Sequence, residues 1–381
     1  MVPVEGTCDE RFAPVREAFV TNFTQRGDVG AAVAVSVGGR PVVDLWGGWA
    51  DAARRRPWRR DTLVNVFSCS KGLSTLCALQ LVERGLVDLD APIARLWPAF
   101  AAAGKEGITL RQVLTHRAGL PAVRAPLPDG AMLDWPRMTA ALAAQAPWWV
   151  PGEAHGYHVN TFGFLVGEVA RRAGAMTLGA WLRAHVAAPL DADVHIGLPA
   201  AEHHRVAEFL WPAGARPRPP ETFADDDERM RWNTYWNPPG LSGDGWVNSA
   251  RWRSAELPST NGHATALGLA RVYASLAAGG RIDGVHVVAA PLLQAAAQEH
   301  SNGLDRVLQR PSRFGIGFQL TQPERPLGPN PGAFGHFGTG GSLGFCDPEA
   351  GVAFAYVMND LGPRWQNPRN RALMDAVYSC L

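Results

Sequence analysis

The residues best suited to chemistry begin with a serine and a lysine on one apolar stretch. Ser68 and Lys71 form the pattern Ser-x-x-Lys, and the apolar stretch that follows runs to Arg84. Residues three apart on a helix are neighbours, so the lysine amine can reach the serine hydroxyl. A serine hydroxyl attacks a carbonyl carbon only when another group accepts its proton. The pair therefore predicts a nucleophile and its base, provided that burial lowers the lysine pKa from its usual value of about 10.4.

A second serine also matches a nucleophile pattern. Ser342 lies within residues 340–344, which read Gly-Gly-Ser-Leu-Gly and match Gly-x-Ser-x-Gly. That motif marks a nucleophile where a strand precedes the serine and a helix follows it. Here the residues after Ser342 have the pattern of a strand, a turn and a strand, and no histidine follows His336. We therefore interpret these glycines as a strand edge that a substrate can approach closely.

Further polar residues suited to chemistry lie on a predicted loop and just before the glycine-rich strand edge. Tyr157 follows a glycine on a loop that enters a helical stretch, where a phenol can project into a cleft. His155 and His158 flank it, but no third ligand accompanies them, which disfavours a metal site. His336 precedes the glycine-rich edge, where exposed backbone N–H groups are expected. No cofactor is predicted.

Together these elements resemble the serine β-lactamase and penicillin-binding-protein superfamily. Its signature is Ser-x-x-Lys, then a loop tyrosine, then a C-terminal Lys-Thr-Gly or His-x-Gly strand. The order and spacing here are most similar to the class C branch and its esterase relatives, the family VIII carboxylesterases. Weaker matches extend the resemblance over nearly the whole chain, at residues 108–121, 156–168, 258–266 and 334–359.

The resemblance implies a role for each matched residue. Ser68 becomes acylated, while Lys71 and Tyr157 share the work of general base and general acid, with the order of proton transfer left open. The backbone N–H groups of Ser68 and Thr339 would form the oxyanion hole. The remaining matched positions would contact the substrate: Asn160, His336, Phe337 and Gly338.

Two positions depart from the class C pattern. Val159 stands where Tyr-x-Asn requires asparagine, and Asn160 comes one residue later. His336 stands where the third motif has lysine. A lysine binds the carboxylate of a β-lactam or a peptidoglycan stem, whereas a histidine with a pKa of about 6.5 is mostly neutral at neutral pH. Both departures favour neutral acyl substrates.

The leading function is therefore a serine carboxylesterase that acts on short- to medium-chain acyl esters. Three alternatives stay open: an acyltransferase with the same chemistry, a weak β-lactamase or D-amino-acid amidase, and a catalytically silent binding protein. Hydrolase and transferase differ only in whether water or an alcohol reaches the acyl-enzyme, and no motif reports that difference.

The elements that must position these residues predict an α/β (α+β) fold. Residues 29–37 and 41–46 flank a Gly-Gly turn and predict a β-hairpin, and residues 71–84 predict a buried helix that ends at Gly85. Residues 186–262, rich in Pro, Trp and charge, predict a loop-rich lid or insertion. Further helices are expected at 110–115, 162–173, 178–185, 264–278 and 369–381, and further strands at 315–320, 343–346 and 352–358.

Strands at both ends of the chain imply a discontinuous architecture. We expect an antiparallel sheet of the β-lactamase/transpeptidase-like type, flanked by helices, with a helical subdomain. The whole chain, 1–381, would be one catalytic domain. Its α/β subdomain would comprise about 1–80 and 264–381, and its helical and loop-rich subdomain about 81–263.

Composition narrows the classes of function and partner. The 36 basic and 35 acidic side chains give a net charge of +1, which provides no field to steer nucleic acid. A small-molecule ester is the expected partner. No secretion signal is visible, and no apolar run approaches the roughly 20 residues of a bilayer span. The five cysteines are scattered and lack zinc-like spacing, which favours free thiols in the cytoplasm.

Overall fold

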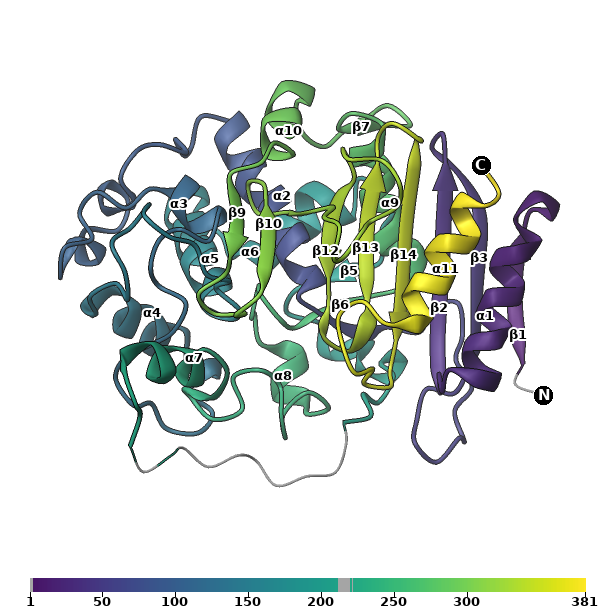
Figure 1. Cartoon of the computed structure of the whole chain (residues 1–381), viewed down its shortest axis with the longest axis horizontal. Helices are drawn as coiled ribbons and strands as arrows, with labels where there is room; N and C mark the ends of the chain where they lie inside the picture. The colour runs from purple at the N-terminus through teal and green to yellow at the C-terminus, as the bar shows by residue number, and fades with distance from the viewer. Residues whose placement is uncertain (1–2, 212–219, 221) are drawn as a thin grey trace.

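The fold is an antiparallel sheet flanked by helices (Figure 1), seen in a computed structural model that describes residues 3–211, 220 and 222–381. The nine strands of the main sheet follow the order β1-β3-β2-β14-β13-β12-β11-β10-β9. β2 (Gly30–Val37) pairs with β14 (Val352–Met358), which joins the N-terminal strands to the C-terminal ones. The prediction that both ends of the chain build one sheet is confirmed.

The other elements have the following bounds. The main sheet also contains β1 (Val4–Cys8), β3 (Arg40–Gly48), β9 (Ser301–Leu304), β10 (Pro311–Phe314), β11 (Gln319–Leu320), β12 (Phe334–Phe337) and β13 (Leu343–Asp347). A smaller sheet contains β4 (Val64–Phe67), β6 (Gly262–Ala264) and β5 (Val194–His195), and a hairpin contains β7 (Arg281–Ile282) and β8 (Val285–His286). The α-helices are α1 (Ala13–Gln25), α2 (Cys69–Glu83), α3 (Leu110–Leu114), α4 (Trp135–Ala144), α5 (Thr161–Gly174), α6 (Leu178–Leu182), α7 (Asp226–Trp236), α8 (Ala250–Ser254), α9 (Ala266–Ala277), α10 (Ala290–Ala296) and α11 (Pro368–Tyr378).

Helices cover both faces of the main sheet. α1 and α11 lie on one face and α9 on the other (Figure 1). Successive side chains of a strand point to opposite faces. Tyr356 of β14 accordingly donates its hydroxyl to Asp28 at 2.7 Å, whereas its neighbour Ala355 pairs with Gly344 beneath α9. Because every position of β14 is buried, its sequence is a continuous apolar run rather than an alternating one.

Helix α2 runs through the centre of the molecule. Every side chain from Cys69 to Leu81 is buried, which confirms the buried helix predicted from the sequence. The helix packs against α5 and α6 on one side and β12 on the other. Gly85 follows it with a φ of 69°, the left-handed conformation that commonly ends a helix.

One local prediction was wrong, and the structure adds detail to two others. Only Gln319–Leu320 is extended within the predicted strand 315–320, because the preceding residues turn from β10 into β11. The helix predicted at 178–185 keeps α-helical bonding only to Leu182 and continues as a π-helical turn. The segment 186–262 contains α7, which begins where the Asp225 carboxylate accepts the Glu228 N–H at 2.7 Å. The acidic run is thus a helix start, where negative charge is favourable.

Some predictions on larger segments stay open. Residues 212–219 and 221, within the predicted lid, lie outside the described residues. The subdomain boundaries near residues 81 and 263 stay a prediction. The described helices include none long and apolar enough to cross a bilayer.

Tyr273 of α9 joins this helix to α2 and to the sheet. A side chain added at Gly72 of α2 would collide with the Tyr273 hydroxyl, and one added at Gly344 of β13 would collide with its ring. The ring therefore fills the space that two glycines leave between helix and sheet. Since Gly72 directly follows Lys71, this packing sets the position of the first turn of α2.

Replacing Gly344 with alanine should lower the free energy of unfolding by about 1–3 kcal/mol, the usual cost of overpacking a core. The added methyl would press on Tyr273 and Leu269. Gly107→Ala is the matched control, because its methyl meets no atom within 4 Å. Denaturant titration of both variants measures the difference. Equal stabilities would show that α9 does not rest on β13 in this way.

Candidate active site

Ser68 stands where a strand turns sharply into a helix. β4 ends at Phe67 and α2 begins at Cys69, so the serine caps the helix. Phe67 has a φ of 45°, a strained conformation for a bulky residue and one that clusters at functional sites. The Ser70 hydroxyl holds this turn by donating to the Phe67 carbonyl and accepting the Gly262 N–H at 2.8 Å. Ser68 thus lies at the positive end of the helix dipole, only 4% exposed.

The Lys71 amine is buried beside Ser68 among uncharged oxygens. Its Nζ lies 3.2 Å from Ser68 Oγ, 2.6 Å from the Val159 carbonyl oxygen and 3.0 Å from the Ser259 carbonyl oxygen. Burial lowers the pKa of Lys71 well below its usual value, because the ammonium form would lose its hydration. A neutral amine has two N–H donors and one lone pair. The two carbonyls take both donors, which leaves the lone pair facing the serine hydroxyl.

Tyr157 is the third member of the cluster. Lys71 Nζ lies 4.7 Å from the centre of its ring, which stacks on Phe314 at 5.7 Å and meets Trp365 edge-on at 5.3 Å. The phenol is fully buried, and among the described residues its hydroxyl makes no hydrogen bond of standard geometry. Burial raises the pKa of Tyr157 well above its usual value, while the hydroxyl of Ser68 opposes this shift. The group is therefore a neutral phenol that can donate a proton.

Two buried histidines, His116 and His336, contact the Tyr157 ring, and the buried His158 follows it in the chain; all three stay neutral. Burial lowers the pKa of His116 well below its usual value, that of His158 to about 4 and that of His336 to about 3. Both ring nitrogens of His158 are occupied, because Nδ1–H donates to the Gly156 carbonyl at 2.7 Å and Nε2 accepts the Leu120 N–H at 3.1 Å. His158 therefore holds the loop rather than exchanging protons. Within the described ranges, no group of three or more His, Cys, Asp or Glu side chains is placed to hold a metal ion.

His336 faces the cluster as a neutral acceptor. Its ring lies 6.0 Å from that of Tyr157, and its Nδ1–H donates to the Phe337 carbonyl at 2.8 Å. Its Nε2 has no hydrogen-bond partner in the part of the chain that the structure describes. The expectation of an ordinary pKa near 6.5 was wrong, because the position is completely buried and Lys71 lies close by.

The strand end after His336 approaches the nucleophile through its backbone. Gly338 lies against the Val66 carbonyl, where no side chain fits, and the Cys69 thiol donates to the His336 carbonyl at 3.2 Å. These contacts hold the segment that contains Thr339 against the start of α2. The oxyanion hole formed by the Ser68 and Thr339 N–H groups stays a prediction.

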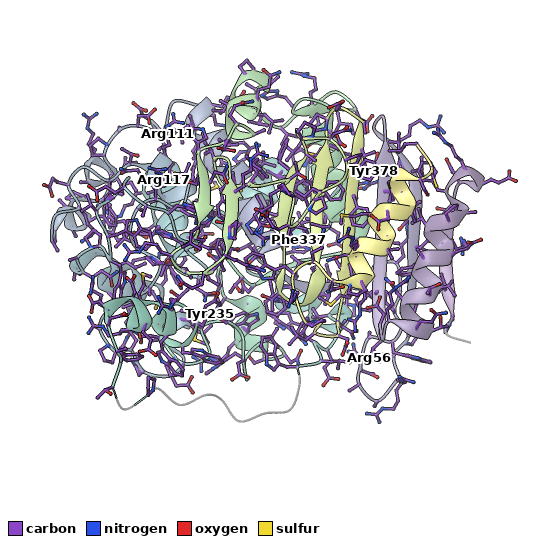
Figure 2. The ribbon with its side chains drawn as sticks, viewed as in Figure 1. Arg56, Arg111, Arg117, Tyr235, Phe337 and Tyr378 are labelled. Carbon is purple, nitrogen blue, oxygen red and sulfur yellow. The ribbon has the colours of Figure 1, made fainter. Side chains whose placement is uncertain are left out.

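Two of the predicted substrate-binding residues have other contacts. Phe337 is buried and follows His336, so its side chain points to the opposite face of β12, in the middle of the molecule (Figure 2). The Asn160 amide donates to the Thr234 carbonyl at 3.0 Å and to Ser242 Oγ at 3.1 Å, while its own oxygen has no partner. Asn160 thereby ties the tyrosine loop to the α7 region.

The structure confirms that a strand, a turn and a strand follow Ser342, which disfavours it as a nucleophile of the Gly-x-Ser-x-Gly type. Residues 339–341 form a short 3-10 turn, and β13, a turn and β14 follow the serine, so no helix begins there. The tryptophans of the 186–262 segment pack as expected. Trp211 lies 6.1 Å from the Phe67 ring, and Trp252 Nε1 donates to Asn65 Oδ1 at 2.9 Å.

Residue-level reasoning missed three contributors to the site. Ser259 binds Lys71 through its carbonyl and accepts the Gly163 N–H at 2.6 Å through its hydroxyl. The only sequence feature that pointed to Ser259 was its position within residues 258–266, which match the family weakly. His116 and Asp305 hold the backbone beside Tyr157. His116 lies within the weakly matching residues 108–121, whereas Asp305 belongs to no motif.

Lys71→Arg tests the neutral amine. A guanidinium stays protonated, so it cannot accept the Ser68 proton. We expect kcat for an activated ester to fall roughly 10³-fold or more, as for loss of a group that acts as a unit with the nucleophile. Rate measurements, with circular dichroism as the control for folding, check this. Substantial activity in a folded Lys71→Arg variant would contradict the assignment.

His336→Lys tests the neutral strand residue. The parent's preference between a carboxylate-bearing ester and a neutral ester should not change between about pH 8 and about pH 5 through His336, which stays neutral there. The lysine variant should raise the relative kcat/KM for the carboxylate-bearing ester roughly tenfold to a hundredfold where the new amine is charged, through a charge-assisted hydrogen bond. An unchanged ratio in the variant would show that position 336 does not face the substrate.

Comparison with known proteins agrees with this geometry. The Beta-lactamase family model matches residues 16–379. The Mycobacterium tuberculosis protein "Esterase/beta-lactamase LipL" is 39% identical over 94% of this chain and 83% of its own. A solved family VIII carboxylesterase and a penicillin-binding-protein homologue from Caulobacter crescentus are each 40% identical over the full length of both chains, with TM-scores of 0.92 and 0.91. The chain therefore belongs to the beta-lactamase family, as its Ser-x-x-Lys helix, loop tyrosine and C-terminal strand indicated.

Proposed function

We propose that this protein is a serine carboxylesterase that hydrolyses short- to medium-chain acyl esters through an acyl-enzyme on Ser68. The observation that carries the proposal is the buried Lys71 amine, with its Nζ 3.2 Å from Ser68 Oγ. The printed names of LipL and of the family VIII carboxylesterase support an ester as the substrate class.

Lys71 is the first base in this mechanism. Its amine takes the Ser68 proton as Oγ bonds to the ester carbonyl carbon, and the carbonyl π electrons move to the oxygen. The Ser68 and Thr339 N–H groups would bind that oxyanion, and each such donor contributes about 3–4 kcal/mol to catalysis. The positive end of α2 stabilises the same negative charge.

Tyr157 is the general acid. Its phenol protonates the alkoxide as the bond between the acyl carbon and the leaving oxygen breaks, and the proton held by Lys71 then restores the phenol. Water repeats the sequence at the acyl-enzyme, giving up one proton and releasing the carboxylic acid and free Ser68. The high pKa of Tyr157 and the low pKa of Lys71 place each proton in its starting position.

Neutral substrates suit this site because its groups are uncharged. His336 offers a lone pair rather than a cation, so it does not compensate the desolvation of a substrate carboxylate. LipL carries both activities in its printed name, which makes β-lactam hydrolysis the second candidate. The cytoplasm is the proposed compartment, because all five cysteines are free thiols. Burial raises the pKa of the Cys69 thiol to about 12, so it does not compete with Ser68.

A fluorophosphonate probe should label the peptide that contains Ser68. Ser68→Ala should lose label and roughly 10³-fold or more of kcat for p-nitrophenyl butyrate while folding normally. Ser342→Ala is the matched control, since it removes the other motif serine and should keep both the label and most of the rate. Labelling at Ser342 would overturn the assignment of the nucleophile.

A substrate panel separates the candidate functions. p-Nitrophenyl esters of increasing chain length, measured beside a chromogenic cephalosporin, should show ester hydrolysis far faster than lactam opening. Product analysis with an added alcohol identifies the acyl acceptor. Transfer of the acyl group to the alcohol in preference to water would show that the protein is an acyltransferase and not a hydrolase.

A further inference from the structure

Asp305 is a fully buried carboxylate in the loop between β9 and β10, outside the three motifs of the site. Both of its oxygens lie 3.1 Å from the backbone nitrogen of Tyr157. It also accepts the Val307 and Leu308 N–H groups at 2.9 Å each and the Ser312 hydroxyl at 2.8 Å. All of these partners are donors, which is the pattern of an acceptor-only, ionised carboxylate.

The hydrogen bond to the Tyr157 N–H is the middle one of three that hold the N–H groups of consecutive residues. The Gly156 N–H donates to the His116 carbonyl at 3.0 Å, and the His158 N–H donates to His116 Nδ1 at 3.2 Å. His116 therefore holds the residues on both sides, and Asp305 holds the catalytic residue itself. Without the carboxylate, the buried Tyr157 N–H would lose its partner and the phenol its fixed position.

A second set of contacts joins the β9–β10 hairpin to the loop that contains Tyr157. The Arg306 N–H donates to the His155 carbonyl at 3.1 Å, and the His155 ring lies 2.9 Å from Ser312 Oγ through Nε2. Because Ser312 gives its hydroxyl proton to Asp305, His155 Nε2–H is the donor in that contact. The β9–β10 hairpin is thus attached to the tyrosine loop at several points, next to the helical part of the molecule (Figure 1).

The charge of Asp305 also acts on the phenol. The neighbouring groups that the phenol ring meets include the neutral Lys71 amine and the neutral rings of His116 and His336. Three further groups oppose ionisation of the phenol: Cys69, Tyr235 and Asp305. Asp305 is the carboxylate among these three groups. Tyr235 comes from α7, on the helical side of the molecule (Figure 2).

We propose that Asp305 is a positioning residue of the reaction, which fixes Tyr157 beside Ser68 through its backbone N–H and presents a negative charge to the phenol. This inference rests on the proposed role of Tyr157 as general acid. The charge keeps the proton on the phenol until the leaving oxygen develops negative charge, so Asp305 acts through Tyr157 and does not touch the substrate.

A purely structural aspartate with similar contacts exists in the same chain and serves as the control. Asp347 is also fully buried, and its carboxylate accepts the N–H groups of Glu349 at 3.1 Å and Ala350 at 3.2 Å. It accepts the Tyr378 hydroxyl at 2.8 Å as well. It shares the turn-holding role of Asp305 but belongs to the turn between β13 and β14, not to the catalytic cluster.

Asp305→Asn removes the charge and preserves the shape. The amide oxygen can accept the three backbone N–H groups, and the amide nitrogen can donate to Ser312. The Ser312 proton then turns to His155, whose neutral ring takes the tautomer that accepts at Nε2. We expect kcat for p-nitrophenyl butyrate to fall roughly tenfold to a hundredfold, as for a slightly displaced catalytic group, with KM changed less than about threefold. Combined with Tyr157→Phe, the substitution should cost little further kcat, because both act through one phenol.

The decisive readout is the ionisation of residue 157, which needs no substrate. A fluorinated tyrosine at this position, whose phenol ionises at lower pH, reports its pKa by fluorine NMR. Loss of the carboxylate should lower that pKa, because a neighbouring negative charge no longer opposes the phenolate. Asp347→Asn should reduce stability but leave both kcat and this pKa unchanged.

An unchanged kcat together with an unchanged phenol pKa in folded Asp305→Asn would overturn the proposal and leave a turn-holding residue. If the wild-type protein hydrolyses no ester but the pKa falls as expected, the proposed function fails while the placement of Asp305 stands. Should Asp305→Asn not fold, Ser312→Ala replaces it. Loss of the donor that partly neutralises Asp305 should raise the phenol pKa, and a fall would contradict the proposal.

Discussion

The site depends on one constraint, the burial of the Lys71 amine without an opposing charge. A carboxylate in contact would stabilise the ammonium form and remove the base, whereas carbonyl oxygens hold the amine and leave its lone pair available. Val159 and Ser259 supply these carbonyls from segments far apart in the sequence. The neutral amine costs little hydration, so the fold can enclose it in a helix that is buried on all sides.

That enclosure explains why the elements around α2 come from both ends of the chain and its middle. β4 turns into the helix at the strained Phe67, the tyrosine loop covers the amine, and β12 lies against the first turn of α2. Tyr273 wedges the same turn against the sheet. Together these contacts fix the first turn of α2 and leave Ser68 only 4% exposed, and low exposure to water strengthens electrostatic interactions there.

The sequence was informative where chemistry is carried by side chains at fixed spacing. Ser68, Lys71 and Tyr157 meet as predicted, and the β2–β3 hairpin and α2 follow from local periodicity. It was uninformative where backbone atoms do the work, since the Val159 carbonyl binds Lys71 whatever side chain stands there. The pKa of His336 and the role of Asp305 depend on complete burial, which arises only when distant segments pack.

The same constraint that suits Lys71 to the proposed role of base also bears on the substrate we expect. A site whose amine and histidines are neutral offers no cation in contact with the phenol to repay the desolvation of an anionic ligand. The carboxylate of Asp305 behind Tyr157 adds repulsion of the same sign. A neutral ester carries no such cost, and its negative charge develops only as Ser68 attacks, at the positive end of α2 where the helix dipole favours it. The proposed preference for neutral acyl groups thus follows from how the proposed base is buried, and position 336 would contribute to it as one neutral ring among three.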